Sequence, residues 1–224
     1  MSNTKDFQDR PMNRTINYIH WFFITNLYFF LCNVPILFVL YTLNISISNI
    51  LIFFVALIPT GPSLTALCSC MNKIHKDKYL DTTRDFFKGY KQNFLVSMKL
   101  WLLFLIPTFI IIFDINLCLT NNKFSYLLIP LIFLFVLILS IGSYSFPLIS
   151  KYEIKLVDLL KLSIYLLFKN IINTIVNLII IFISAYLFYN SNGIISIFLF
   201  STACYASLFN MKKSFMFVEN KFLR

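Results

Sequence analysis

The stretch Pro59-Thr60-Gly61-Pro62-Ser63 places two prolines and a glycine inside a segment that otherwise has the apolar composition of a membrane helix. Pro59 disfavours helical geometry at the residue before it, Gly61 lets the chain bend, and Pro62 suits the first turn of a new helix. We therefore expect a first helix that ends near residue 57 and a second that starts near Pro62.

Such a break can do chemistry, because it points backbone N–H groups and the positive end of a helix dipole into the bundle. An anionic or hydroxylated ligand would suit that place. A structural kink is the alternative, since other prolines in apolar segments indicate that this chain uses kinks freely. Both interpretations stay open. The candidate residues for a cavity or helix break are Asn33, Pro59, Thr60, Gly61, Pro62 and Ser63.

Other polar side chains recur at helical spacing inside apolar segments. Asn26 and Asn33 are seven residues apart and share one face of a helix, and Asn170, Asn173 and Asn177 do the same. Because such residues avoid lipid, both faces should point into the bundle. They either form interhelical hydrogen bonds or line a polar cavity.

Residue types for catalysis or metal binding are sparse. Asp114 is the only acidic residue well inside an apolar segment, where it is either a solvated interfacial group or a proton or cation site. The cysteines include one close pair, Cys68 and Cys70, whose side chains diverge on a helix, so we interpret the cysteines as apolar packing residues. Paired carboxylates, a His-Glu-x-x-His motif and a Walker motif are missing from the sequence. We expect no catalytic residue, no metal and no cofactor, and therefore no enzyme.

The elements that position these residues follow from composition. Of 224 residues, 59% are hydrophobic and only 12% are charged, against about 25% charged in a typical soluble domain. The apolar runs are continuous and do not alternate, which favours helices over a membrane barrel. We predict an all-α polytopic bundle, a single integral membrane domain over residues 1–224 with six spans in three hairpins. The expected spans are residues 21–43, 47–70, 96–119, 126–149, 170–189 and 194–211.

The basic residues predict an orientation. With these spans, 18 of the 19 Lys and Arg residues fall on one side, and only Lys123 falls on the other. The positive-inside rule then places both termini in the cytoplasm. The net charge of +10 is divided among short loops, which favours anionic lipid head groups as partners and argues against nucleic acid.

Residues 82–94 predict a cytoplasmic amphipathic helix in the plane of the interface. Thr82 and Asp85 have the spacing of a capping box, and aromatic side chains then recur on one face with basic side chains beside them. Residues 157–169 show a fainter version of the pattern. The candidate surface for a partner or for lipid consists of Arg84, Phe87, Lys88, Tyr90, Lys91 and Phe94.

The Pro59-Thr60-Gly61-Pro62 turn, the following Ala66-Leu67, and residues 85–94 together resemble the YesL family of bacterial integral membrane proteins of unknown function. The resemblance covers residues 17–101. Ser63 departs from the alanine that is usual there, which leaves the turn intact. The resemblance implies a small polytopic protein of the bacterial cytoplasmic membrane that is often encoded beside carbohydrate ABC transporters and sensor kinases. It implies no catalytic or binding residues.

Two function classes follow as expectations. The first is an accessory or small permease-like component associated with carbohydrate uptake, whose ATPase would be another chain. The second is a membrane sensor or scaffold that presents the helix of residues 82–94 to a partner protein. ABC transporter subunits and a sensor kinase are the expected protein partners.

Overall fold

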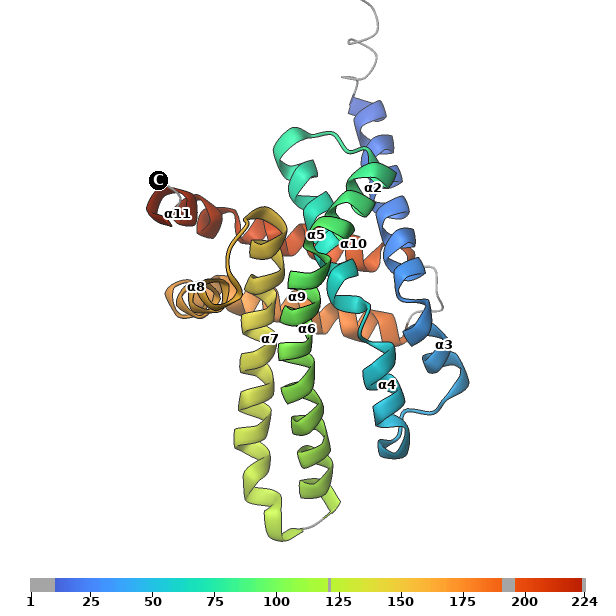
Figure 1. The fold of residues 1–224 in the computed structure, drawn as a ribbon, viewed down its shortest axis with the longest axis vertical. Coiled ribbons are helices and arrows are strands. Elements are labelled where there is room, and N and C mark those ends of the chain that lie inside the picture. Colours follow the sequence, from blue (N-terminus) through green and yellow to red (C-terminus); the bar gives the residue numbers. More distant parts are fainter. Residues whose placement is uncertain (1–10, 121, 191–195, 223–224) are drawn as a thin grey trace, which may run out of the picture.

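The computed structural model describes residues 11–120, 122–190 and 196–222, and every regular element in these ranges is helical (Figure 1). The elements are α2 (Pro11–Cys32), α3 (Val34–Thr42), the 3-10 helix η1 (Ile47–Asn49), α4 (Ile50–Ala56), α5 (Thr60–Asp77), α6 (Thr82–Thr120), the 3-10 helix η2 (Asn122–Leu127), α7 (Leu128–Lys151), α8 (Leu156–Lys169), α9 (Ile171–Asn190), α10 (Ser196–Asn210) and α11 (Lys212–Phe222). The all-α prediction is confirmed for this part of the chain.

Three to five helices in the described residues can cross a membrane. Thr82–Thr120, Phe124–Lys151 and Ile171–Asn190 are long and apolar enough by themselves, and two bent pairs of helices raise the number to five if each pair is one span. The expected sixth span is the 15-residue α10, whose length of about 22 Å is less than the roughly 30 Å of a hydrocarbon core. In Figure 1, α9 and α10 run across the α6–α7 hairpin and not along it. Six spans in three hairpins therefore stay a prediction, and residues 191–195 of the third turn lie outside the described residues.

Two sharp bends divide the first half of the chain. The axis turns by 69° between α2 and α3 and by 49° between the η1–α4 segment and α5. The second bend confirms the break expected near Pro62, although α5 already begins at Thr60. At the first bend Asn33 leaves helical geometry just ahead of Pro35, whose ring removes an N–H donor and crowds the preceding turn.

Residues 82–94 form no separate interfacial helix, which corrects the expectation for this segment. They are the first turns of the continuous 39-residue helix α6. The Asp85 carboxylate accepts a hydrogen bond from the backbone N–H of Asp81 at 2.9 Å, one residue before the Thr82 expected as its partner. The fainter second pattern does correspond to a separate helix, α8.

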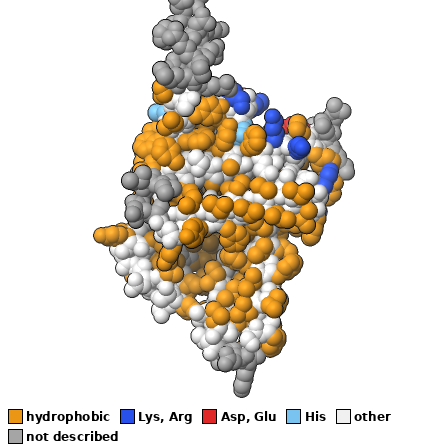
Figure 2. Space-filling model, turned by 180° about the vertical axis from the view of Figure 1, so that it is seen from behind, with side chains coloured by type: hydrophobic (Ala, Val, Ile, Leu, Met, Phe, Trp, Pro, Cys, Tyr) orange, Lys and Arg blue, Asp and Glu red, His pale blue; other side chains and the backbone are white. Residues whose placement is uncertain are grey.

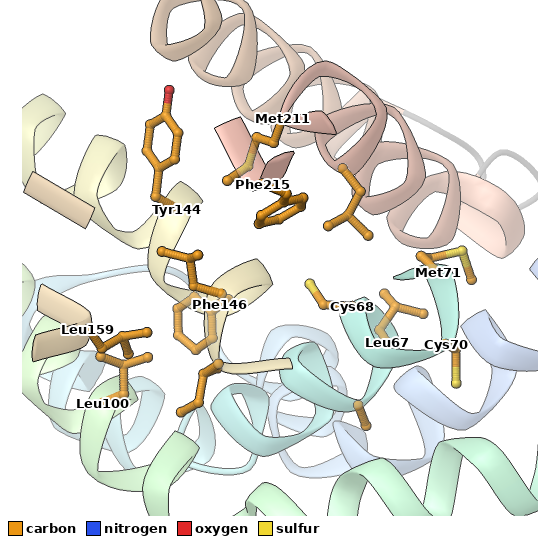
Figure 3. Packing of buried hydrophobic residues seen from close by; sticks show 14 of the residues in the cluster. Leu67, Cys68, Cys70, Met71, Leu100, Tyr144, Phe146, Leu159, Met211 and Phe215 are labelled. Carbon is orange, nitrogen blue, oxygen red and sulfur yellow. The ribbon is translucent and has the colours of Figure 1, made fainter. Parts of the chain in front are cut away.

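The buried core lies at one end of the molecule and is centred on α5. Leu67, Met71 and Ile74 of α5 are completely buried, and α5 packs against α2, α6, α7 and α10. Figure 3 shows Cys68 of α5 lying toward Phe146 of α7 and Phe215 of α11, all of them members of one buried cluster that also contains Leu67. This end of the fold is held together by side-chain packing in the manner of a soluble core.

The far half of the α6–α7 hairpin has no such cover. Ile129 and Phe133 of α7 are 78% and 67% exposed, and many other large apolar side chains on α3, α4, α6 and α9 are exposed as well. A surface of this size requires an apolar surrounding. Figure 2 shows the same division, with basic side chains gathered at one end and a broad hydrophobic surface beyond them. The chain therefore has the helices and the surface of a membrane protein.

Candidate functional site

The two bends meet at one hydrogen-bonded cluster, which we call the Asn33 joint and define as Asn33, Thr60 and Ser63. The Asn33 side-chain amide donates to Ser63 Oγ at 2.8 Å, and its carbonyl accepts from Thr60 Oγ1 at 2.7 Å. The same amide also donates to the backbone carbonyl of Phe29 at 2.8 Å. The break in one expected span is thus fastened to the break in the other.

The polar groups of the Asn33 joint are used within the protein. Asn33 is 2% exposed and Ser63 is completely buried, and the Ser63 hydroxyl also donates to the Thr60 carbonyl at 2.9 Å. Pro59 and Thr60 are half-buried, while Gly61 and Pro62 are buried. All six candidate residues lie at this one place, and their mutual bonding favours the structural kink over a ligand-facing break.

Trp101 of α6 closes the break from the other side. Its indole N–H donates to the Leu57 carbonyl at 2.7 Å, which supplies a partner at the point where the helix is interrupted. A β-carbon built at Gly61 would lie 2.3 Å from Trp101 Cβ, so only glycine allows this approach. No local pattern in the sequence indicates a role for Trp101, because its contact with Leu57 spans 44 residues.

Asn26, the other asparagine of the first helix, ties α2 to α10. Its amide donates to the Ile197 carbonyl at 2.7 Å and its carbonyl accepts from the Ser201 N–H at 3.2 Å. These two groups lie one helical turn apart in α10, so the Asn26 side chain bridges the first turn of that helix. Asn26 is completely buried, which confirms that this polar face points into the bundle.

The asparagines of α9, together with Asn170 just before that helix, make a second interhelical contact. Asn210 of α10 donates to the Asn173 carbonyl and to Asn177 Oδ1, both at 2.9 Å, and Asn170 donates to Ser214 Oγ at 2.9 Å. Asn177 Nδ2 is the one buried side-chain nitrogen or oxygen in the described residues that has no partner. An unsatisfied buried donor costs about 1–3 kcal/mol, and this amide N–H has the capacity to donate a hydrogen bond to an acceptor that the chain itself does not supply.

The candidate surface on α6 is exposed on one side of the helix. We call its exposed members the basic stripe of α6: Arg84, Phe87, Lys88 and Lys91. Their spacing of three and four residues places them along one line of a helix. Tyr90 and Phe94 are half-buried beside the stripe with their ring centroids 5.4 Å apart. The aromatic side chains expected on one face do not share one environment. Phe86 is buried against Tyr28, whereas Phe87 is 48% exposed.

The acidic residue inside an apolar segment lies apart from the Asn33 joint. Asp114 is half-buried near the far end of α6, and the side chain of Lys123, its expected neighbour, lies outside the described residues. Within the residues that the structure describes, no three His, Cys, Asp or Glu side chains are grouped so that they could hold a metal ion.

Cys68 and Cys204 form a contact that spacing in the sequence could not predict. Their sulfur atoms lie 3.0 Å apart between α5 and α10, although the residues are 136 positions apart. Both are free thiols. They thereby provide a chemical test of the packing of α10 on α5.

Mild oxidation of the purified protein with copper phenanthroline is expected to join Cys68 to Cys204. The two thiols lose two protons and two electrons to the oxidant as the S–S bond forms, and sulfurs that are held close together react in preference to more distant pairs. Peptide mass spectrometry without reduction identifies the pair, and Cys68→Ser must abolish it while Cys118→Ser leaves it. Preferential linking of Cys68 to Cys70 would refute the packing described.

Fold and site together define a class: an all-helical protein with three to five helices able to span a membrane, whose two bent helix pairs are fastened at a buried polar joint. In comparison with known families, residues 22–115 match the model described as "Protein of unknown function, DUF624". The match contains the Asn33 joint and the basic stripe of α6, and it is consistent with the resemblance to the YesL family. No curated protein and no solved structure matches the chain.

Proposed function

We propose that this chain is a multi-pass protein of the bacterial cytoplasmic membrane that acts as an accessory or scaffold component beside a carbohydrate uptake system. The observation that carries the proposal is the closed state of the Asn33 joint. Its hydroxyl and amide groups bond to one another, which supports a structural role for the helix break and thereby an accessory role for the chain. An accessory role needs a docking surface and needs no path.

The basic stripe of α6 supplies such a surface. Three positive charges and one exposed aromatic ring lie along one line of the helix, a combination that suits an acidic protein surface rimmed by apolar groups. ABC transporter subunits and a sensor kinase are the partners that we propose. In the proposed orientation both termini and the stripe face the cytoplasm, which agrees with the gathering of basic side chains at one end in Figure 2.

Charge reversal in the stripe tests the proposal. Lys88→Glu with Lys91→Glu is expected to lower the amount of partner that co-purifies from native membranes by about tenfold or more, because like charges then face the acidic surface. The matched control is Lys161→Glu with Lys213→Glu, which changes the net charge equally at two other exposed sites and should keep the partner. Mass spectrometry identifies and quantifies the partner. Equal recovery with both double variants would contradict the proposal.

A permease-like role is the second candidate, and the unpartnered Asn177 Nδ2 favours it, because a buried donor without a partner can bind a hydroxylated solute. This role predicts that a deletion strain loses carbohydrate uptake and that Asn177→Leu fails to restore it. The stripe variant Lys88→Glu with Lys91→Glu would restore uptake fully under this alternative.

A further inference from the structure

A second group of basic side chains lies in a cleft where the end of α5, the connection after α7 and the α10–α11 segment meet. The cleft has a volume of about 700 Å³, in the range of small-molecule sites. Its walls contain five lysines and two acidic residues. The lysines are Lys73, Lys76, Lys78, Lys151 and Lys212, and the acidic residues are Asp77 and Glu219. We call this place the lysine cleft.

Two of the lysines already have partners. Lys73 pairs with Asp85 at 2.6 Å, and Lys151 pairs with Glu219 at 2.9 Å and lies 4.7 Å from the centre of the Phe215 ring. The hydrogen bond from Lys151 lowers the pKa of the Glu219 carboxyl, which keeps that internal pair charged. For Lys76, Lys78 and Lys212 the described part of the chain offers no ion pair. Lys76 is near enough to Glu219 that its charge helps to lower the pKa of that carboxyl, and none of the three lysines is held in an ion pair that would have to break before a ligand binds.

The backbone at Lys78 is unusual. Lys78 ends α5 in the left-handed conformation with φ of 54°, and it is the one residue other than glycine with a positive φ in the described ranges. Glycine is the usual residue at this position of a helix end, because a side chain there costs about 1 kcal/mol. Lys78 therefore adopts a strained backbone conformation where it lines the cleft. Glycine would avoid the strain, but only lysine supplies a positive charge at this position.

Aromatic side chains form another part of the lining of the cleft. The His75 ring stacks on the Tyr205 ring with centroids 3.9 Å apart, its Nε2 lies 3.1 Å from the Tyr205 carbonyl oxygen, and Phe209 lies next to it. Asn72 and Ser150, which also line the cleft, are joined by a hydrogen bond from the Asn72 amide to Ser150 Oγ at 2.7 Å. A ligand that fits this cleft has an anionic group for the lysines and an organic part for the rings.

We propose that the lysine cleft binds a phosphate-bearing organic anion, with the phosphate held by Lys76, Lys78 and Lys212 and the organic part packed against Tyr205 and Phe209. Lysine is a compact point charge that suits phosphate, and three of them exceed what one carboxylate would need. Both a phospholipid head group and a soluble phosphorylated metabolite have this chemistry. The site is separate from the basic stripe of α6, so either proposal can fail without the other.

The test uses the full chain purified in detergent or reconstituted in bilayers. Glucose 6-phosphate and inorganic phosphate are the soluble probes, measured by titration calorimetry and by the shift in melting temperature. Nanodiscs of phosphatidylcholine with or without phosphatidylglycerol are the lipid probe, measured by the same shift. Glucose 6-phosphate should bind more tightly than inorganic phosphate, because only the sugar phosphate can use the aromatic wall.

The variant Lys76→Gln, Lys78→Gly, Lys212→Gln is expected to bind the effective probe on the order of a hundredfold more weakly. Lys78→Gly relieves the backbone strain, so it should not impair folding, which the melting temperature without probe verifies. The matched control neutralises three other exposed lysines: Lys99→Gln, Lys161→Gln and Lys213→Gln.

A loss that is confined to the cleft variant supports the site. The soluble probe then identifies a metabolite as the source of the phosphate, and the phosphatidylglycerol arm identifies a lipid. Equal affinity of the cleft variant and the control for every probe, or no binding by the unmodified protein, overturns the proposal.

Discussion

Gly61→Ala is expected to lower the free energy of unfolding by about 3 kcal/mol, the upper end of the usual cost of overpacking a core. The added methyl group would lie 2.3 Å from Trp101 Cβ and 2.6 Å from Trp101 Cγ, and no real β-carbon approaches another atom so closely. Trp101 cannot move away freely, because its indole N–H is bonded to the Leu57 carbonyl at the break. Unfolding in mixed detergent micelles, followed by the tryptophan fluorescence, measures the loss.

The control for this substitution is Gly142→Ala in α7. A β-carbon at Gly142 meets no atom within 4 Å, and alanine is the better helix former by up to about 1 kcal/mol. The control should be neutral or stabilising. If Gly61→Ala were as stable as Gly142→Ala, the close packing of α5 on α6 would be wrong.

Asn33→Ala is expected to cost about 2 kcal/mol, because it removes three hydrogen bonds that lipid cannot replace and interhelical bonds in membranes contribute on the order of 0.6 kcal/mol each. Loss of the buried side chain adds the remainder. The measurement is again the free energy of unfolding. Asn190→Ala is the matched control, since Asn190 is exposed and bonds only within its own helix turn, to the Tyr186 carbonyl.

A double-mutant cycle separates the joint from general packing. Asn33→Ala and Ser63→Ala should be non-additive by about 1 kcal/mol, because both remove the same hydrogen bond, whereas Asn33→Ala and Asn190→Ala should add. Additivity of the first pair would show that the Asn33–Ser63 bond does not contribute to stability.

Local signals in the sequence were sufficient for the break in the second helix pair. The geometry of proline and glycine acts on immediate neighbours, so the interruption at residues 57–60 is predictable within about three residues. The structural role of the break depends on the residues that it contacts. The partners of Thr60 and Ser63 lie 27 and 30 residues away at Asn33, and that of Leu57 lies 44 residues away at Trp101. Spacing carries no information about such contacts.

Hydropathy was less informative about where helices begin and end. It indicates whether a residue lies in the membrane or at its surface, but a helix can continue from one to the other. The expected boundary between an interfacial helix and a span is therefore absent, because α6 is continuous. The predicted final span, residues 194–211, corresponds to a shorter helix, α10, and the charged residues after it form α11. The lysine cleft was missed for the same reason, because its lysines come from α5, α7 and α11 and only the fold brings them together.

The Asn33 joint has a mechanical consequence. Asn33 belongs to the corner between α2 and α3, and both of its hydroxyl partners belong to the corner that opens α5. Straightening either corner alone would cost the shared hydrogen bonds, so the two angles are energetically coupled. The first half of the chain thus contains two bent helix pairs that share one set of hydrogen bonds. A change in the bend angle of one pair is therefore expected to change the bend angle of the other.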